Sequence, residues 1–359
     1  MQISVSDYLR LPELSPLFLE GDALSVLRQF PGDSLDCCLT SPPYWGQRQY
    51  EGGGIGLEGE AHQFIRNLLE ITKEIKRVLK PTGSFWLNID DTYRNKSLMG
   101  IPWRVAIAMM DEQGWTLRNG VDWNKHKGGL DSSKDKLRNV YEPFFHFVKD
   151  PRNYFYDDKA IRANARKSVV KNGAVVSATG VSGVRYKRQL ELSTALSEEE
   201  KRAALRDLNE VLSRVVAGKV SDFRMIIRGQ QRATHSESEH VSGRAKELMT
   251  KGYYFLFYHP DGTLPSDVWD ILPEDSQKRK KHYAVFPEDL CQIPILATCP
   301  KGGVMLDPFC GTGTTQLAAL KNGRKSIGID ISAEYLQLAH ERIDEYTKQS
   351  LGVLQLFNE

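Results

Sequence analysis

The sequence lacks the features that would point to a membrane or secreted protein. No apolar run among the 359 residues approaches the roughly 20 residues of a membrane span. The first residues, 1–11, show no basic stretch followed by an apolar one, which a secretion signal requires. The charges nearly balance, with 48 Lys and Arg against 46 Asp and Glu. We therefore expect a cytoplasmic chain of about two domains, without a membrane partner.

Cysteine is scarce and shows no metal-binding or redox spacing. The five residues, Cys37, Cys38, Cys291, Cys299 and Cys310, form no C-x-x-C pair and mostly lie in apolar surroundings. This pattern predicts reduced cysteines in the core and no metal site.

Two consecutive prolines mark the first candidate site. The segment Thr40-Ser41-Pro42-Pro43-Tyr44-Trp45 follows the apolar run at 37–39, which is typical of a buried strand. Proline fixes its own φ, donates no N–H and holds the preceding residue extended, so Ser41 and Tyr44 should leave the strand in a stiff turn. In an open α/β sheet, ligands bind at this edge.

Such a turn has the groups that a nucleobase pocket needs. The Ser41 hydroxyl and the carbonyls freed by the prolines can accept hydrogen bonds from an –NH2 group, and Tyr44 offers a face on which an extruded base can stack. Alone, the motif is equally compatible with a plain rigid turn.

A second candidate site lies near the other end of the sequence. The apolar segment 304–307 runs into a turn that contains Gly311 and Gly313, and a helix is expected from 316 to 321. A further strand, 326–329, ends in Asp330, where an acid can bind ribose hydroxyls. The third glycine of a dinucleotide fingerprint and the lysine of a phosphate loop are both missing. The acid Asp307 would repel pyrophosphate, so we expect a nucleoside cofactor that bears an amino group and a sulfonium.

Together the two motifs carry a family resemblance. Ser-Pro-Pro-Tyr-Trp at 41–45 and Asp-Pro-Phe-Cys-Gly-Thr-Gly-Thr-Thr at 307–315 resemble amino-methylating DNA methyltransferases of the beta type, in which the catalytic loop precedes the S-adenosylmethionine loop. Segments 19–24, 79–86 and 282–287 are also similar, so the resemblance covers residues 18–150 and 265–345.

The resemblance implies a fold and a domain order. The fold would be a Rossmann-like α/β methyltransferase with a seven-stranded sheet and an inserted target-recognition region. Residues 1–150 would form the catalytic half, 151–264 the DNA-binding insert and 265–359 the cofactor-binding half.

The resemblance also implies roles for single residues. Ser41, Pro42, Pro43 and Tyr44 would form the catalytic turn. The residues implied to bind S-adenosylmethionine are Asp22, His282, Phe286, Asp307, Phe309, Gly311, Thr312, Gly313, Thr314 and Asp330. Asp22 has a second interpretation, as the N-cap of a helix from residue 23, which does not exclude the first.

The middle of the sequence carries a local excess of positive charge. Residues 151–250 hold 19 Lys and Arg against 12 Asp and Glu, interleaved with Tyr154, Phe155, Tyr156 and Tyr186. This composition predicts a surface that follows the phosphates of duplex DNA, although a solvated face has the same charge pattern. The candidate DNA-binding residues are Arg162, Arg166, Lys167, Arg185, Lys187 and Arg188.

The motifs favour methylation of an exocyclic amine. In the resembled family, serine at position 41 is associated with the N4 amine of cytosine, whereas Asp or Asn there is associated with the N6 amine of adenine. We therefore expect a site-specific cytosine-N4 DNA methyltransferase, with adenine-N6 methylation as the alternative. Expected partners are double-stranded DNA and a cognate restriction endonuclease, and the protein would be a monomer or a homodimer. A DNA-binding module without catalysis and a methyltransferase acting on RNA or protein are the other classes that the sequence permits.

Overall fold

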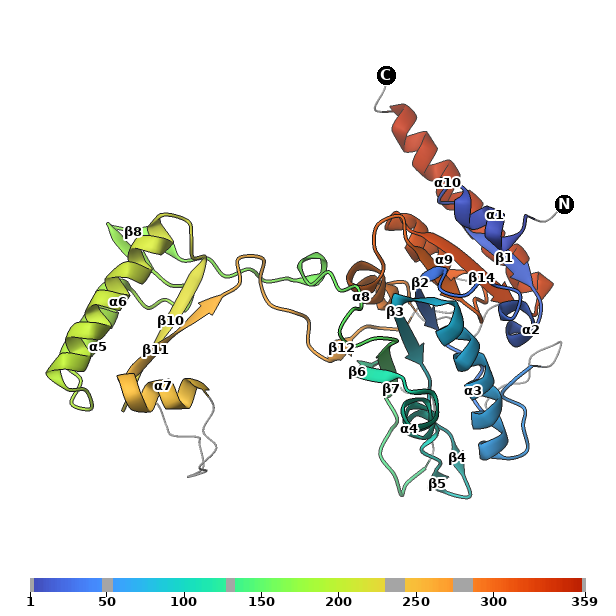
Figure 1. Cartoon of the computed structure of the whole chain (residues 1–359), viewed down its shortest axis with the longest axis horizontal. Coiled ribbons are helices and arrows are strands. Elements are labelled where there is room, and N and C mark those ends of the chain that lie inside the picture. Colours follow the sequence, from blue (N-terminus) through green and yellow to red (C-terminus); the bar gives the residue numbers. More distant parts are fainter. Residues whose placement is uncertain (1–2, 47–53, 127–132, 230–242, 274–286, 357–359) are drawn as a thin grey trace. The chain divides into compact units, whose positions relative to one another are not determined.

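The chain divides into two compact units, as seen in a computed structural model that describes residues 3–46, 54–126, 133–229, 243–273 and 287–356. Unit 1 comprises residues 1–161 and 266–359, and unit 2 comprises residues 162–265 (Figure 1). The family resemblance predicts the first boundary at residue 150. Residues 151–161 bond to unit 1 instead, because the Phe155 N–H donates to the Thr82 carbonyl (2.9 Å) and the Asp157 N–H to the Ala297 carbonyl (2.8 Å).

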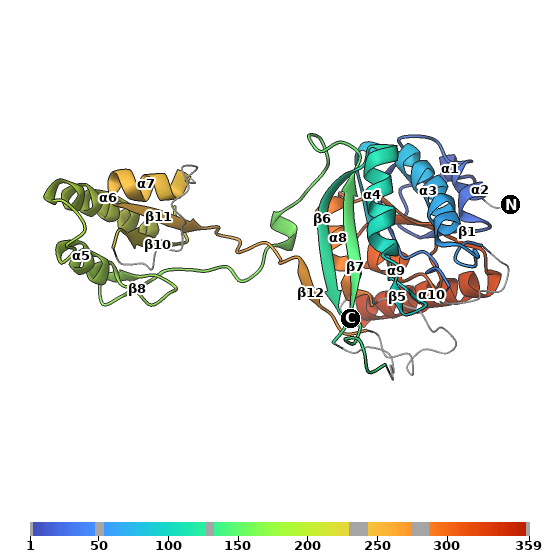
Figure 2. The ribbon, with the colours of Figure 1, turned by 90° about the horizontal axis from the view of Figure 1, so that it is seen from below.

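Unit 1 is built on a mixed sheet of eight strands, counted over the described residues, in the order β1-β14-β13-β2-β3-β7-β6-β12 (Figures 1 and 2). The first five strands pair in parallel, and β7 runs antiparallel to both of its neighbours. The strand bounds are β1 Leu17–Glu20, β2 Leu35–Thr40, β3 Leu79–Asn88, β6 Thr116–Asn124, β7 Tyr141–Val148, β12 Val268–Asp270, β13 Val304–Asp307 and β14 Lys325–Asp330. The predicted α/β sheet is confirmed. It has one strand more than the expected seven, because β12 pairs in parallel with β6.

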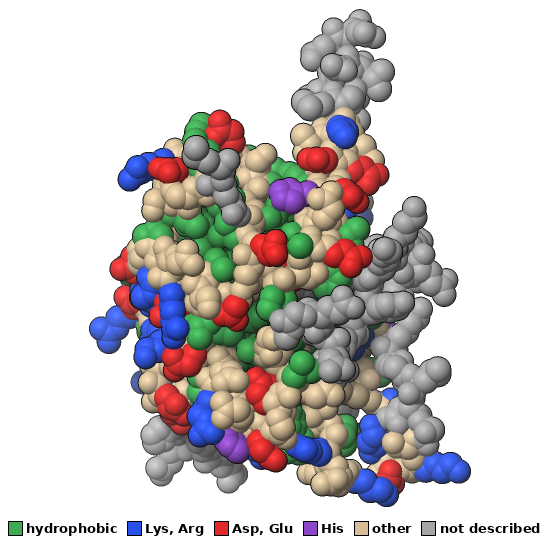
Figure 3. Space-filling model, turned by 90° about the vertical axis from the view of Figure 1, so that its right-hand side faces the viewer, with side chains coloured by type: hydrophobic (Ala, Val, Ile, Leu, Met, Phe, Trp, Pro, Cys, Tyr) green, Lys and Arg blue, Asp and Glu red, His purple; other side chains and the backbone are tan. Residues whose placement is uncertain are grey.

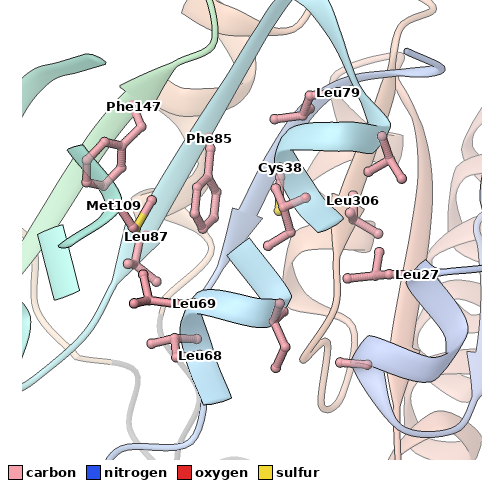
Figure 4. Close-up of a cluster of buried hydrophobic side chains, with 14 of the residues drawn as sticks. Leu27, Cys38, Leu68, Leu69, Leu79, Phe85, Leu87, Met109, Phe147 and Leu306 are labelled. Atoms are coloured by element: carbon pink, nitrogen blue, oxygen red, sulfur yellow. The ribbon is translucent and has the colours of Figure 1, made fainter. Parts of the chain in front are cut away.

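Helices cover both faces of this sheet. Because successive strand residues point to opposite faces, Cys38, Leu87 and Leu306 pack with α2, α3 and α4 (Figure 4), whereas Cys37, Leu39 and Met305 pack with α8 and α9. Burial on both faces explains why the central strands β2 and β13 are buried along their whole length. The helices and short elements of unit 1 are α1 Val5–Arg10, α2 Ala23–Leu27, α3 Ala61–Val78, β4 Tyr93–Arg94, β5 Ser97–Leu98, α4 Ile101–Gln113, η1 Lys159–Ile161, α8 Asp289–Thr298, α9 Thr314–Lys321 and α10 Ala333–Leu356. In the described part of the chain, no helix combines the length and apolar character that a bilayer crossing requires.

Unit 2 has a core of its own. Leu190, Leu208 and Phe223 are fully buried there, and a capping box formed by Ser197 and Glu200 starts α6. Tyr186 is 3% exposed and packs against Phe223, so it does not belong to an exposed aromatic surface. The elements of unit 2 are β8 Val169–Lys171, β9 Ala174–Val176, α5 Gly183–Glu191, α6 Glu198–Val216, β10 Asp222–Ile227, α7 Gly243–Lys251 and β11 Tyr253–Tyr258.

Candidate active site

The strand directions bring the two sequence motifs to one edge of the unit 1 sheet. The parallel strands β13, β14, β2 and β3 end at this edge, and the antiparallel β7 begins there. In register, Met305 and Leu306 of β13 pair with Cys37 and Cys38 of β2. Polar residues therefore meet at the edge although they lie far apart in the sequence; they are Ser41, Asn88, Glu142, Asp307 and Asp330.

Asp307 joins the two motifs directly. Its Oδ1 accepts a hydrogen bond from the Thr40 hydroxyl at 2.6 Å, and its Oδ2 accepts one from the Thr315 hydroxyl at 2.7 Å. The residue is 1% exposed, and this burial raises the pKa of Asp307 to about 6 in spite of the hydroxyl donors. Its carboxylate therefore links β2 to β13 and α9 from inside the protein, and a direct contact with a cofactor stays a prediction.

The turn after β13, residues 309–314, is called the glycine turn below. Gly311 and Gly313 have φ values of +51° and +72°, which residues that carry a side chain rarely adopt. The Gly311 N–H donates to Asp330 Oδ2 at 2.8 Å. Thr312 and Thr314 are buried, and the Arg342 guanidinium of α10 reaches both hydroxyls at 3.3 Å. These contacts hold the turn against the end of β14.

Gly328, which lies outside the glycine turn, allows Cys310 of the turn to pack closely against β14. A Cβ at position 328 of β14 would lie 2.8 Å from the Cys310 sulfur. Gly328 thus allows the close packing that the third glycine of the dinucleotide fingerprint normally allows. The spacing of that fingerprint does not include a glycine at this position.

Phe309 of the glycine turn and Asp330 at the end of β14 are partly exposed. Asp22 is exposed at the end of β1, which pairs with β14. The Asp22 carboxylate accepts from the Ser25 N–H (2.9 Å), so its predicted role as helix N-cap is confirmed, while a cofactor contact stays a prediction. His282 and Phe286 lie outside the described residues.

The Ser-Pro-Pro-Tyr turn, residues 41–44, leaves the end of β2 as predicted. Ser41, Pro43 and Tyr44 are partly exposed, and Pro42 is buried. The Ser41 hydroxyl lies 3.0 Å from the Tyr44 hydroxyl. Burial, and then the Glu142 carboxylate, raise the pKa of Tyr44 well above its ordinary value, so the phenol keeps its proton.

The Tyr44 side of this turn rests on buried polar residues that the sequence motifs do not indicate. The Tyr44 hydroxyl lies 3.0 Å from Asn88 Oδ1 and 2.8 Å from Glu142 Oε2, and Lys125 Nζ lies 2.6 Å from Glu142 Oε1. Burial, and then Glu142, raise the pKa of Asp90 to about 6. A signal was present in the sequence, because Asn88 and Glu142 are polar residues at the ends of apolar strands.

The cysteines are unsuited to nucleophilic catalysis. All five are buried and none forms a disulfide. Burial raises the pKa of Cys37 to about 12 and that of Cys38 well above its ordinary value. Since the thiolate is the reactive form, these residues act as core side chains, as the sequence predicts.

The predicted DNA-binding residues fall into two groups in unit 2. Arg185, Lys187 and Arg188 lie on α5, where both arginines are exposed. Before β8, Arg162 donates to the Gly262 carbonyl at 2.9 Å, Arg166 stacks over the Tyr258 ring at 4.9 Å, and Lys167 is exposed. The face of the molecule drawn in Figure 3 carries acidic and basic side chains mixed together, in contrast to this local run of cations.

The aromatic residues before unit 2 do not join these cations. Tyr154 and Tyr156 pack around His146, at ring distances of 6.1 and 6.4 Å, and Phe155 bonds to β3. Residues 154–156 therefore belong to unit 1 and not to the unit that carries the predicted cations, and their part in a DNA-binding surface stays a prediction.

A family model described as a DNA methylase, N6_N4_Mtase, matches residues 35–341. The chain belongs to this family. DNA methylases of this family use S-adenosylmethionine as the methyl donor, so the cofactor expected from the two motifs is confirmed at the level of the family.

Curated relatives match most of the chain. The type II methyltransferase M.SfiI of Streptomyces fimbriatus is 29% identical, over 88% of this chain and 88% of its own length. M.XycI of Xanthomonas campestris pv. cyanopsidis is 29% identical, over 92% and 87%. The DNA adenine methyltransferase YhdJ of Escherichia coli K12 is 24% identical, over 91% and 82%.

A solved structure shares the fold. The PvuII DNA methyltransferase, named as cytosine-N4-specific, superposes with a TM-score of 0.53 at 18% identity, over 91% of this chain and 89% of its own. The fold prediction is thereby confirmed for a DNA methylase sheet.

Proposed function

We propose that this DNA methylase transfers a methyl group from S-adenosylmethionine to the exocyclic N4 amine of a cytosine flipped out of duplex DNA at a specific site. The observation that supports it is the 2.6 Å bond between Thr40 and Asp307, which joins the ends of β2 and β13 at the points where the Ser-Pro-Pro-Tyr turn and the glycine turn follow. A group bound at one turn would thus lie next to a group bound at the other. The order of the two turns along the chain corresponds to the beta type.

The residues around the glycine turn fit the cofactor. Asp330 and Phe309 are partly exposed, and the two left-handed glycines let the backbone approach a ligand closely. Asp330 would accept from the ribose hydroxyls, Phe309 would contact the adenine ring, and Asp22 would contribute from the end of β1. When bound, S-adenosylmethionine supplies a methyl group activated on a sulfonium.

The Ser-Pro-Pro-Tyr turn would hold the target base. The Ser41 hydroxyl and the Pro42 carbonyl would accept the two hydrogens of the base amine, which restores nucleophilicity to a nitrogen lone pair delocalised into the ring. Tyr44 would stack on the base through its exposed part. The methylated nitrogen is strongly acidic and loses its proton without a strong base.

Serine at position 41 is the reason for preferring cytosine. A hydroxyl and a carboxylate can both orient an amine, so this preference rests on the residue association in the resembled family. Adenine-N6 methylation remains the alternative, and the names of the similar proteins include one adenine and one cytosine-N4 methyltransferase.

We further propose that unit 2 is the target-recognition region and that its cations on α5 and before β8 contact DNA phosphates. The names of M.SfiI and M.XycI as type II methyltransferases support a role in restriction-modification with a cognate endonuclease. A monomer or a homodimer would be compatible with this role.

Nucleoside analysis tests the proposal. Unmethylated plasmid DNA is incubated with the protein and S-adenosylmethionine, digested to nucleosides and analysed by mass spectrometry. We expect N4-methylcytosine. N6-methyladenine would establish the alternative. If no modified nucleoside forms, calorimetry with S-adenosylmethionine separates the other two classes: a DNA-binding module without catalysis would not bind the cofactor, whereas a methyltransferase acting on RNA or protein would.

A further inference from the structure

A chain of hydrogen bonds runs from the Ser-Pro-Pro-Tyr turn into the sheet. It leads from Ser41 to the Tyr44 hydroxyl (3.0 Å), then to Glu142 Oε2 (2.8 Å), and ends at Lys125, which is 2.6 Å from Glu142 Oε1. The Glu142 side chain is 9% exposed and that of Lys125 18%. A carboxylate this deep in the protein is costly unless its partners are well placed, so the question is what it does for the turn.

The single proton of the Tyr44 hydroxyl determines the direction of these bonds. A phenol has one proton to donate. On its buried side, the Tyr44 hydroxyl has two acceptors, Glu142 Oε2 at 2.8 Å and Asn88 Oδ1 at 3.0 Å. The Asn88 amide nitrogen donates to Glu142 Oε2 (3.1 Å) and to the Pro143 carbonyl (3.3 Å), which leaves its oxygen as an acceptor. Whichever acceptor takes the phenol proton, that proton points inward, so it is not available to Ser41.

The direction of the remaining bond is then determined. At 3.0 Å from Tyr44, the Ser41 hydroxyl must donate its own proton to the phenol oxygen. Both lone pairs of Ser41 are left to accept from another group. Glu142 Oε1 pairs with the Lys125 ammonium at 2.6 Å, and a carboxylate can only accept hydrogen bonds. The chain of bonds is therefore polarised from Ser41 toward Glu142.

We propose that Glu142 is a positioning residue that acts through Tyr44 to keep the Ser41 hydroxyl in its accepting orientation toward the target amine. This inference rests on the proposed function, because an amine can only donate to Ser41 if the serine proton is directed elsewhere. It gives Tyr44 a second role beside stacking, one that needs its oxygen rather than its ring.

The variants Tyr44→Phe and Glu142→Gln test the inference in single-turnover methylation of unmethylated plasmid DNA. Tyr44→Phe keeps the ring and removes the oxygen that receives the serine proton. In Glu142→Gln, Lys125 holds the amide oxygen, so the amide NH2 faces Tyr44 and competes with Ser41 for the phenol oxygen. We expect the rate of methyl transfer to fall about tenfold or more in each variant. The dissociation constant of S-adenosylmethionine, measured by calorimetry, should stay within about twofold.

Asp36→Asn is the matched control. Asp36 has an 8% exposed side chain and pairs with Lys80 at 2.7 Å, much like Glu142 and Lys125, but it lies at the start of β2, on the opposite edge of the sheet. This control should lower the melting temperature and leave the transfer rate unchanged.

Three results would overturn the inference: a rate of Tyr44→Phe or of folded Glu142→Gln within about threefold of wild type, a rate loss matched by an equal loss of cofactor affinity, or the same loss in Asp36→Asn. If Glu142→Gln does not fold, Tyr44→Phe decides alone. Failure of the wild-type protein to modify DNA would refute the proposed function itself, whereas wild-type turnover with unaffected variants would refute only this inference.

Discussion

In unit 1 the candidate functional groups stand at one edge of a sheet buried on both faces, whereas in unit 2 the candidate cations stand on exposed helix and loop surface. The first arrangement makes each group depend on buried neighbours, as Asp307 depends on Thr40 and Thr315. In the second, the arginines of α5 are exposed on the side of the helix that faces away from the buried Tyr186 and Leu190. A single substitution should therefore change chemistry or stability in unit 1, and only the strength of DNA binding in unit 2.

Ser41→Ala should give the largest effect. Removing the hydroxyl leaves the target amine without one of its two acceptors, and we expect the single-turnover rate to fall by about 10²- to 10³-fold, as for other positioned hydrogen bonds to a reacting group. Calorimetry should show S-adenosylmethionine binding with near wild-type affinity. A parallel loss of affinity would mean that Ser41 supports the cofactor site instead, and that the two turns are not separate in function.

The buried Asp307 should make the stability of unit 1 depend on pH. Burial raises the pKa of Asp307 from an ordinary value of 3.8 to about 6. Its contribution to stability is therefore fully present below pH 4 and is lost as the pH rises through 6, by about 3 kcal/mol in total.

The Asp307→Asn variant isolates this contribution, because it has no such proton to lose. Chemical denaturation at pH 4 and at pH 7 should show the free energy of unfolding of wild type falling relative to the variant over this interval. A constant difference would show that the carboxylate ionises in the folded protein as easily as in water.

Gly313→Ala should have a smaller effect, on stability and on cofactor affinity together. A Cβ there would lie 2.9 Å from the Ala339 Cβ, and the residue has a φ of +72°. We expect a loss of about 2 kcal/mol, from backbone strain and overpacking.

Gly323→Ala is the control, since Gly323 has the same φ of +72° with nothing within 4 Å. It should lose about 1 kcal/mol from strain alone and bind S-adenosylmethionine normally. Equal effects of the two variants on cofactor affinity would show that the glycine turn is not a cofactor cradle.

The same contrast explains what the sequence could predict. The Ser-Pro-Pro-Tyr turn and the glycine turn each follow a buried apolar strand, and parallel strands end at one edge, so their proximity follows from strand direction. Asn88 and Glu142 were missed because their role depends on register, with β7 antiparallel to β3, and a one-residue shift would turn Glu142 to the other face. Gly328 was missed because its role depends on a neighbour 18 residues away in sequence, Cys310.

For unit 2, the charge pattern shows where the cations lie in the sequence, but not which residues pack around them. The local excess of Lys and Arg could be recognised from composition, whereas the burial of Tyr186 on the inner side of α5 could not. The aromatic residues at 154–156 were assigned to the same surface, yet they pack near His146 in unit 1. Composition alone does not say which of two cores an aromatic ring joins.

The double variant Arg185→Gln and Arg188→Gln should have the smallest effect, and it tests whether the cations of unit 2 act one by one. If each arginine neutralises one phosphate, the slope of log affinity against log salt should decrease in magnitude by about 2, and binding to a nonspecific duplex should weaken about tenfold at moderate salt. Fluorescence anisotropy over a series of salt concentrations measures both. Cofactor binding should not change, because α5 lies in unit 2.

The matched control is Arg202→Gln with Arg206→Gln, a pair of exposed arginines on α6 of the same unit. Both double variants remove the same charge, so a nonspecific effect of net charge would weaken binding equally in the two. A change in slope confined to the α5 pair assigns the phosphate contacts to that helix. An unchanged slope in the α5 pair would mean that its cations form a solvated face. Arg166 and Lys167 before β8 would then be the remaining candidates for phosphate contacts.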